Sequence, residues 1–180
     1  NQTLWDVAKE LGVSADLMAA LGNISRTQLD AYAVRSHQLA NKAQQENRFQ
    51  SSLVPISLNA ETILAHDELI RENTSLETLT ALEPSFGQFL SKKHREMIAS
   101  ELPALAEFQH VHHVGNSPSL ADGAALVVIG NEAAAKKLNK PPIAKIIGTL
   151  SIAEHPMLLL GGQVAAEKLL KNCNLTIEDM

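Results

Sequence analysis

Two apolar segments in the second half of the chain constrain its fold most strongly. GAALVVIG (123–130) is a continuous apolar run bounded by glycine, and IAKIIGTLSI (143–152) follows a Pro-Pro pair. Segments of this kind predict strands that are buried on both faces. NEAAAKKLNK (131–140), which separates them, predicts a helix capped by Asn131, and residues 156–174 predict a second helix. The order strand, helix, strand, helix is typical of α/β proteins.

The first half of the chain, to about residue 110, predicts helices joined by polar loops. Arg26 and Asp30 are four residues apart in this half, so we expect them to pair on a helix surface. In chain order, the predicted elements are a helix over 14–23 capped by Ser14, a helix over 24–49 capped by Ser25, a short edge strand over 51–58 that contains Pro55, a helix over 75–86, and a partly helical excursion over 87–109.

Composition excludes several classes of protein. With a net charge of -5 and no basic stripe, a nucleic-acid partner is not expected. No apolar run is long enough for a membrane span. The single cysteine excludes an internal disulfide framework and is typical of a reducing compartment, so we expect a cytoplasmic protein, or an organellar one such as mitochondrial in a eukaryote. Because the chain begins at Asn1 and ends soon after an apparent helix, we expect it to be a fragment.

Three histidines, His110, His112 and His113, precede a turn rich in small residues. One interpretation is a metal site, and the other is that the imidazoles hydrogen-bond the backbone. Zinc takes three or four ligands, and no carboxylate or cysteine stands at a recognised spacing, which favours the second interpretation and predicts no metal. The turn GNSPSLADG lacks the spacing of a phosphate-binding loop, although the hydroxyls of Ser117 and Ser119 are suited to a ligand contact.

Cys173 and Arg71 are the other candidate functional residues. Cys173 has no histidine near it in sequence, which favours a small side chain packed at a helix end over a nucleophile. For Arg71, the residues alone favour a solvated salt bridge to Asp67 or Glu68.

Several motifs in a fixed order resemble the thiolase family, the acyl-CoA C-acetyltransferases. LGVSAD (11–16) resembles the family's M-G-x-x-A-E, and SRTQLDAYAVRS (25–36) resembles S-R-x-x-Q-D-x-(F/Y)-A-x-x-S. DELIRENTSLETLTALEPSF (67–86) resembles D-E-x-x-R-x-x-x-(S/T)-L-E-x-L-x-x-L-x-P-x-F. GNSPSLADGAALVVIGNEAA (115–134) resembles G-N-(S/A)-S-G-x-x-D-G-A-A-A-V-x-x-x-S-E-x-A, and the rest resembles the strand and helix that follow.

The resemblance implies a central fragment of a thiolase subunit. Residues 1–118 would be a mainly helical loop (lid) domain with a short edge strand. Residues 119–140 would be the last strand and helix of the first half of the layered α/β core, and residues 141–180 would begin the second half. The family's nucleophilic cysteine lies before this stretch, and its catalytic histidine and second cysteine lie after it. No catalytic residue is therefore expected in this chain.

The resemblance further implies that this segment binds coenzyme A. Arg71 corresponds to the arginine that meets the adenine and phosphate end, and Pro118 stands where the family has a serine that hydrogen-bonds the pantetheine arm. Proline has neither a hydroxyl nor an amide hydrogen, so a neighbouring serine would have to replace that contact. The implied binding residues are Leu11, Arg71, Thr78, Phe86, Val114, Ser117, Pro118 and Ser119.

The function implied is that of an acetyl-CoA C-acyltransferase of fatty-acid metabolism. It acts on acetyl-CoA and 3-oxoacyl-CoA by thiolysis or Claisen condensation, through an acyl-cysteine. Coenzyme A is a substrate, no cofactor is permanently bound, and a homodimer or homotetramer is expected. The alternatives are a thiolase-like acyl-CoA or lipid-binding protein without catalysis, and a helical domain with no ligand. Because the two apolar segments have few partners within the chain, we also expect poor solubility or obligate association.

Overall fold

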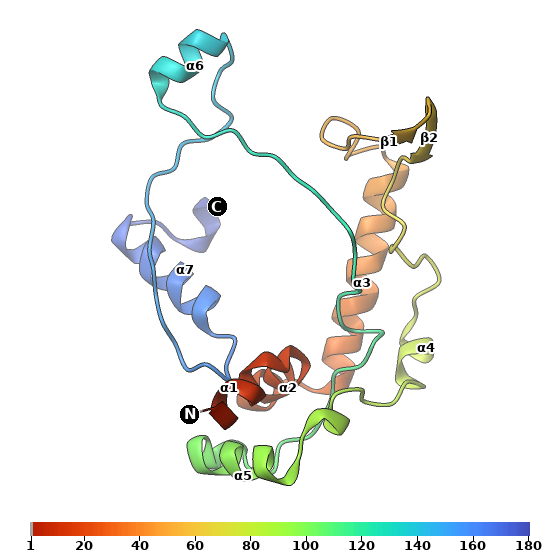
Figure 1. Ribbon diagram of the computed structural model, residues 1–180, viewed down its shortest axis with the longest axis vertical. Coiled ribbons are helices and arrows are strands. Elements are labelled where there is room, and N and C mark those ends of the chain that lie inside the picture. The colour runs from red at the N-terminus through yellow and green to blue at the C-terminus, as the bar shows by residue number, and fades with distance from the viewer. Residues whose placement is uncertain (1) are drawn as a thin grey trace. The chain divides into compact units, whose positions relative to one another are not determined.

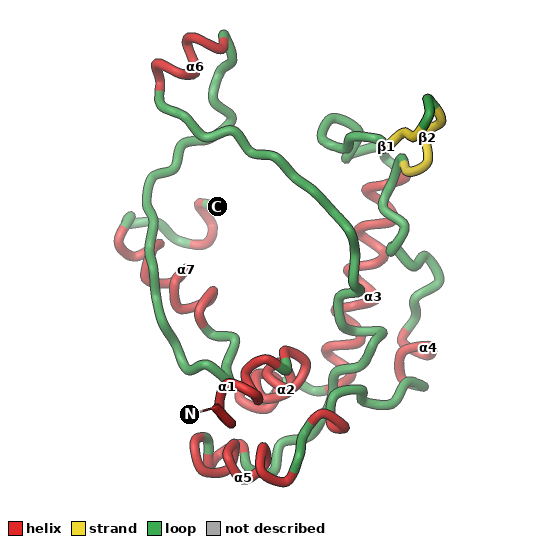
Figure 2. Tube along the Cα trace, in the orientation of Figure 1, coloured by secondary structure: helices red, strands yellow, loops and turns green. Residues whose placement is uncertain are grey.

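The computed structural model describes residues 2–180, which divide into two units. Unit 1 runs to Ala121 and includes Pro156–Leu158, and unit 2 comprises Asp122–His155 and Leu159–Met180. Helices and loops make up most of both units (Figure 1, Figure 2), and the described residues form a single two-stranded sheet. Within the described chain, none of the helices combines the length and the apolar character that a membrane crossing requires.

The core of unit 1 is built mainly from α1 (Gln2–Lys9), α2 (Leu11–Leu21), α5 (Lys92–Glu101) and the 3-10 turn η2 (Pro103–Leu105). α1 packs on α2 and α5, and η2 packs on α2 and α5. Each fully buried aliphatic side chain contributes about 1.5–3 kcal/mol to folding. The buried cluster consists of Val7, Val13, Leu17, Leu90, Ile98, Leu105 and Met157.

α2 corrects the helix predicted over 14–23. It begins at Leu11, so Ser14 lies inside the helix rather than at its N-cap, and its buried hydroxyl has no hydrogen-bond partner among the described residues. The capping pattern was misleading because burial of Val13 and Leu17 extends the helix upstream. The predicted end is confirmed: Gly22 caps the helix, and Asn23 follows with a φ of 51°. α1 was not predicted.

α3 (Arg26–Gln45) confirms the second predicted helix and its cap, although it ends four residues before the predicted end at 49. The Ser25 hydroxyl accepts from the Gln28 amide, and the Gln28 side chain accepts from the Ser25 amide, which completes a capping box. Beyond the C-terminal end of α3 lies an antiparallel hairpin of β1 (Ile56–Leu58) and β2 (Glu61–Leu64) (Figure 1). The predicted strand is thus shorter than 51–58 and begins after the proline, which cannot donate to a ladder.

α4 (Leu76–Thr80) is shorter than the helix predicted over 75–86, and it packs against α3. The Arg26 guanidinium fixes the end of α4, because its Nη2 donates to the carbonyls of Leu79 (2.8 Å) and Leu82 (2.7 Å). Its Nε donates to Asp30 at 2.9 Å, and Asp30 is 1% exposed. The Arg26–Asp30 pair is therefore part of the interior, not the surface pair that was predicted. Residues 87–109 are partly helical as predicted, with η1 (Gly87–Phe89), α5 and η2.

Unit 2 contains the two predicted helices, although the second begins at Gly161 rather than at 156, and it does not contain the two predicted strands. α6 (Glu132–Leu138) is capped by Asn131 as expected, and α7 (Gly161–Asn172) and η3 (Ile177–Asp179) follow. Residues 123–130 and 143–152 form no strand in the described structure and lie in loop (Figure 2). The predicted burial of these segments is also wrong: Val127, for example, is 82% exposed and Ile146 is 64% exposed. A strand exists only when it is hydrogen-bonded to a neighbour, and neither segment has one here.

Gly12 in α2 allows an aromatic ring to lie against the helix. A Cβ at this position would lie 2.3 Å from ring atoms of Phe86. We predict that Gly12→Ala lowers the free energy of unfolding by about 1–3 kcal/mol, because the ring must be displaced. Urea unfolding followed by circular dichroism measures this. Gly162→Ala in α7 is the matched control: its Cβ meets no atom within 4 Å, so its effect is neutral or stabilising. Equal stability of Gly12→Ala and the parent would contradict the prediction.

Candidate functional site

The segments that carry Leu11, Phe86 and Val114 come together in unit 1. The Phe86 ring lies over Gly12, the residue next to Leu11. The Ser85 amide donates to the His112 carbonyl at 3.0 Å, which holds the 84–86 segment close to the turn at 114–119. The side chains of Leu11 and Val114 are mostly exposed, while Phe86 is half-buried against the core. Packing and hydrogen bonding thus bring together three segments that are distant in sequence.

The turn at 114–119 also packs against α4. A Cβ at Gly115 would lie 2.6 Å from Leu79 Cδ2 and 2.8 Å from Leu82 Cδ1, so a larger residue there would require these side chains to move. α4 carries Thr78, whose hydroxyl is engaged locally: Thr78 Oγ1 donates to the Ser75 carbonyl (2.9 Å) and accepts from the Ser75 amide (3.1 Å). The role of Thr78 at a ligand stays a prediction, with its hydroxyl already committed to the capping box of α4.

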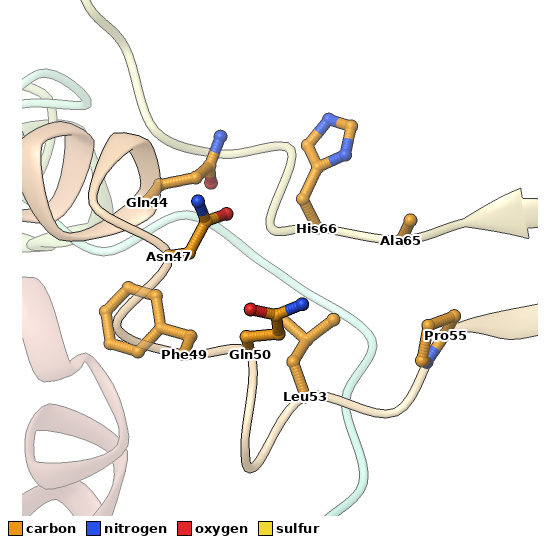
Figure 3. A pocket seen from close by; sticks show the side chains of 8 residues that line it. All are labelled: Gln44, Asn47, Phe49, Gln50, Leu53, Pro55, Ala65 and His66. Carbon is orange, nitrogen blue, oxygen red and sulfur yellow. The ribbon is translucent and has the colours of Figure 1, made fainter.

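The remaining predicted residues of the turn are open to solvent. Pro118 and Ser119 are exposed, and Ser117 is half-buried. None of the eight predicted residues lines a cavity of about 350 Å³ at the end of α3, whose lining includes Phe49, Leu53, Pro55, Ala65 and His66 (Figure 3). The predicted residues therefore lie on an open surface of unit 1 rather than in that cavity.

Arg71 is held by its backbone and leaves its side chain exposed. Its amide donates to Nδ1 of His37 on α3 at 3.1 Å, and its carbonyl accepts from the Thr74 hydroxyl at 2.9 Å. The predicted ion pair with Asp67 or Glu68 is not formed among the described side chains. The guanidinium, which suits forked contacts to phosphate oxygens, is thus available to a ligand.

Asp16 is the centre of a buried hydrogen-bond network that sequence reasoning missed. Its side chain, on α2, is fully buried. Its carboxylate accepts hydrogen bonds from Nδ1 of His110 (2.6 Å), Nδ1 of His112 (2.8 Å) and the backbone amides of Val111 (3.0 Å) and His112 (2.9 Å). One carboxylate therefore accepts four bonds from a segment about 95 positions later in the chain. The two histidines bond a carboxylate instead of the backbone that was predicted.

Asp30 forms a second network of the same kind on α3. His113 Nε2 faces its Oδ1 at 2.8 Å, and Asn116 Nδ2 donates to the same oxygen at 2.9 Å. Because Nδ1 of His113 accepts the Gly115 amide at 3.0 Å, its proton is on Nε2, and the imidazole donates to Asp30. The network joins α3 to the turn at 114–119.

Hydrogen bonding keeps both buried carboxylates ionised. Burial raises the pKa of Asp16, but bonds from the His112 ring, the Val111 amide, the His110 ring and the His112 amide outweigh it and lower that pKa below its ordinary value. Burial likewise raises the pKa of Asp30, and His113, the bond and charge of Arg26, and Asn116 together lower it. Such paired charges are stabilising only while every partner is present.

The three histidines and Cys173 all make structural contacts. Within the described residues, no three His, Cys, Asp or Glu side chains are arranged to hold a metal ion. Cys173 caps α7 and is half-buried, and a Cβ at Gly148 would lie 2.9 Å from its sulfur. This is the packing role that was predicted for it. Sequence signals for Asp16, Asp30 and Asn116 did exist, because each stands inside one of the quoted motifs.

Comparisons with known proteins point to one family. Residues 1–89 match the profile described as thiolase, N-terminal domain. Over 175 residues, 94% of this chain, the chain is 33% identical to the 3-ketoacyl-CoA thiolase of Aliivibrio fischeri and to a probable acetyl-CoA acyltransferase of Staphylococcus aureus. It is 30% identical to the 3-ketoacyl-CoA thiolase of Pectobacterium carotovorum, with all of this chain covered. The matched region is 40%, 39% and 43% of those relatives, so the chain spans about two fifths of their length.

The two networks predict acid sensitivity. A lowered carboxyl pKa means that the unfolded state binds protons more tightly than the folded state. Each carboxylate therefore makes its full contribution to the free energy of unfolding above the unfolded-state pKa of about 3.9, and this contribution is lost as the pH falls below that value. We expect Asp16→Asn and Asp30→Asn to lower the free energy of unfolding at pH 7 by about 3 kcal/mol. Both variants should also show a flatter loss of stability between pH 5 and pH 3 than the parent.

Urea unfolding at half-unit pH intervals measures this, and Asp67→Asn is the control, because Asp67 is exposed. The control should keep the parent's acid slope. An unchanged slope in both Asp16→Asn and Asp30→Asn would show that neither carboxylate carries the effect.

Proposed function

Because this chain belongs to the thiolase family, we propose that it is part of an acyltransferase acting on acetyl-CoA and 3-oxoacyl-CoA, and that it supplies a coenzyme A-binding surface. The observation that carries the proposal is that the segments of Leu11, Phe86 and Val114 come together in unit 1. The same unit carries the Arg71 guanidinium, which is exposed and forms no ion pair among the described residues. Coenzyme A needs both features, an apolar wall for the pantetheine arm and a cation for phosphate.

Each residue has a proposed role. Arg71 meets the adenine and phosphate end of coenzyme A, and Phe86 packs beside the nucleotide. Leu11 and Val114 line the path of the pantetheine arm. At the turn, Ser117 or Ser119 takes the hydrogen-bonding role that Pro118 cannot fill. The surface belongs to the proposed lid domain over residues 1–118.

The chemistry requires groups beyond this surface. Thiolysis and Claisen condensation use an acyl-cysteine, a second proton-transferring group and an oxyanion site. Cys173 is the single cysteine of the chain and is packed at the end of α7, so we assign it no catalytic role. The catalytic cysteines and histidine are proposed to come from the rest of a full-length subunit. That protein is proposed to be a cytoplasmic or organellar homodimer or homotetramer, with coenzyme A as a substrate and no permanently bound cofactor.

Residues 119–140 and 141–180 are proposed to belong to the two halves of the layered core. In that arrangement the exposed apolar segments 123–130 and 143–152 become strands when neighbouring strands pair with them. We predict that the isolated 180-residue chain self-associates through these segments, since unpaired apolar strands are templates for association. Sedimentation velocity measures this. Lys substitutions at Val127 and Ile146 should restore a monomer, and a monomeric parent at micromolar concentration would contradict the prediction.

Arg71 gives the direct test of the proposed function. Isothermal titration of the 180-residue chain with coenzyme A should give a measurable Kd, and Arg71→Ala should weaken it by about tenfold to a hundredfold, because a hydrogen-bonded charge pair to phosphate is lost. Arg48→Ala is the matched control: Arg48 is an exposed arginine paired with Glu46 beyond α3, and its loss should leave the Kd unchanged. Absence of binding by a folded parent chain would refute the proposal.

A further inference from the structure

His37 makes a specific contact with the backbone of the residue proposed to bind phosphate. It lies in the middle of α3 and is half-buried. Its Nδ1 accepts the amide hydrogen of Arg71 at 3.1 Å, across 34 residues of sequence. A ring nitrogen can accept only when it carries no proton, so the contact requires a neutral imidazole with its hydrogen on Nε2.

The backbone amide and the backbone carbonyl of Arg71 are held by different neighbours. On the carbonyl side, the Thr74 hydroxyl (2.9 Å) and the Thr74 amide (3.3 Å) donate to the Arg71 oxygen, in a turn that leads directly into the Ser75 cap of α4. On the amide side, His37 is the anchor, and it attaches the segment to α3. Without His37, the turn would keep its own shape but lose this attachment.

We propose that His37 is a positioning residue, which fixes Arg71 against α3 so that the guanidinium meets a phosphate group of coenzyme A, and which releases Arg71 when its own ring is protonated. This inference rests on the proposed function. It adds a proton-dependent control of the phosphate contact, located in a side chain that does not itself touch the ligand.

The charges around His37 support release upon protonation. The facing segment carries Asp67, Glu68 and Glu72 as well as Arg71, and of these the Arg71 guanidinium is the group that shifts the pKa of His37. A protonated His37 ring would therefore be repelled by the positive charge of Arg71. α4, which also packs on α3, has one titratable side chain, Glu77, and that carboxylate does not offset the effect of Arg71. No titratable group lies one turn away on α3 itself, where the positions are Ala33, Val34, Ala40 and Asn41.

Burial and the nearby Arg71 charge lower the pKa of His37. The neutral, accepting form is therefore the one present at pH 7.5, and the contact is lost only as the pH falls below the ordinary histidine value of about 6.5. The direction follows from the sign of the shift, because the folded state takes up this proton less readily than the unfolded state.

The test compares three forms of the 180-residue chain, the parent, His37→Ala and His37→Asn, by isothermal titration with coenzyme A from pH 7.5 to pH 5.0. Asn places an acceptor oxygen near the position of Nδ1 and does not titrate. At pH 7.5 we expect His37→Ala to bind about fivefold more weakly than the parent, and His37→Asn to match the parent. As the pH falls, the parent should lose about fivefold more affinity than His37→Asn does. The 3′-phosphate of coenzyme A titrates in the same pH range. Because His37→Asn has no titrating ring at this position, its curve measures the pH dependence that comes from the ligand.

A second measurement does not depend on the ligand. In an NMR pH titration of the uncomplexed chain, the Arg71 amide shift should follow the titration of the His37 ring, and the dependence should vanish in His37→Asn. Equal pH dependence of binding in the parent and His37→Asn, or an Arg71 amide that ignores the ring, would overturn the inference while leaving the proposed function intact. If the folded parent does not bind coenzyme A, the proposed function is refuted instead. The NMR titration of the Arg71 amide then tests the contact between His37 and Arg71 by itself.

Discussion

Two ionised aspartates inside unit 1 hold the rest of that unit in place. Asp16 on α2 and Asp30 on α3 take hydrogen bonds from His110, His112 and His113, residues more than 80 positions away. A buried carboxylate is costly unless every lone pair is satisfied, so the positions of the two helices and of the 110–116 segment are fixed together. The turn at 114–119 and the helix α4 depend on this arrangement.

Close approach of backbone and side chains also holds these segments of unit 1 together. Gly12 admits the Phe86 ring, and Gly115 admits Leu79 and Leu82. Arg26 links the Asp30 network to α4, because its guanidinium donates both to Asp30 and to the carbonyls at the end of α4. Motifs that look like ligand-binding signatures therefore act partly as packing devices. They leave the side chains of Leu11, Val114 and Arg71 exposed at the surface.

Local signals in the sequence were reliable where the structure depends on neighbours in the chain. The caps Ser25 and Asn131 were predicted correctly because a cap bonds an amide only three residues away. The capping role predicted for Ser14 failed because burial of Val13 and Leu17 outweighed the local preference. The histidine cluster was recognised, but its partners were not, since nothing in the spacing of 110–113 identifies carboxylates at 16 and 30.

The sequence by itself determined most of the helices, although not α1, as well as the packing role of Cys173 and the resemblance that led to the family. Tertiary structure decided the rest: the buried Asp16 and Asp30 networks, the ring of Phe86 over Gly12, and the contact between His37 and Arg71. The apolar pattern of 123–130 and 143–152 did not produce strands in this structure, where neither segment has a neighbouring strand. The physical reason is that helix hydrogen bonds close within four residues, whereas strands and buried charges require partners that the local sequence does not identify.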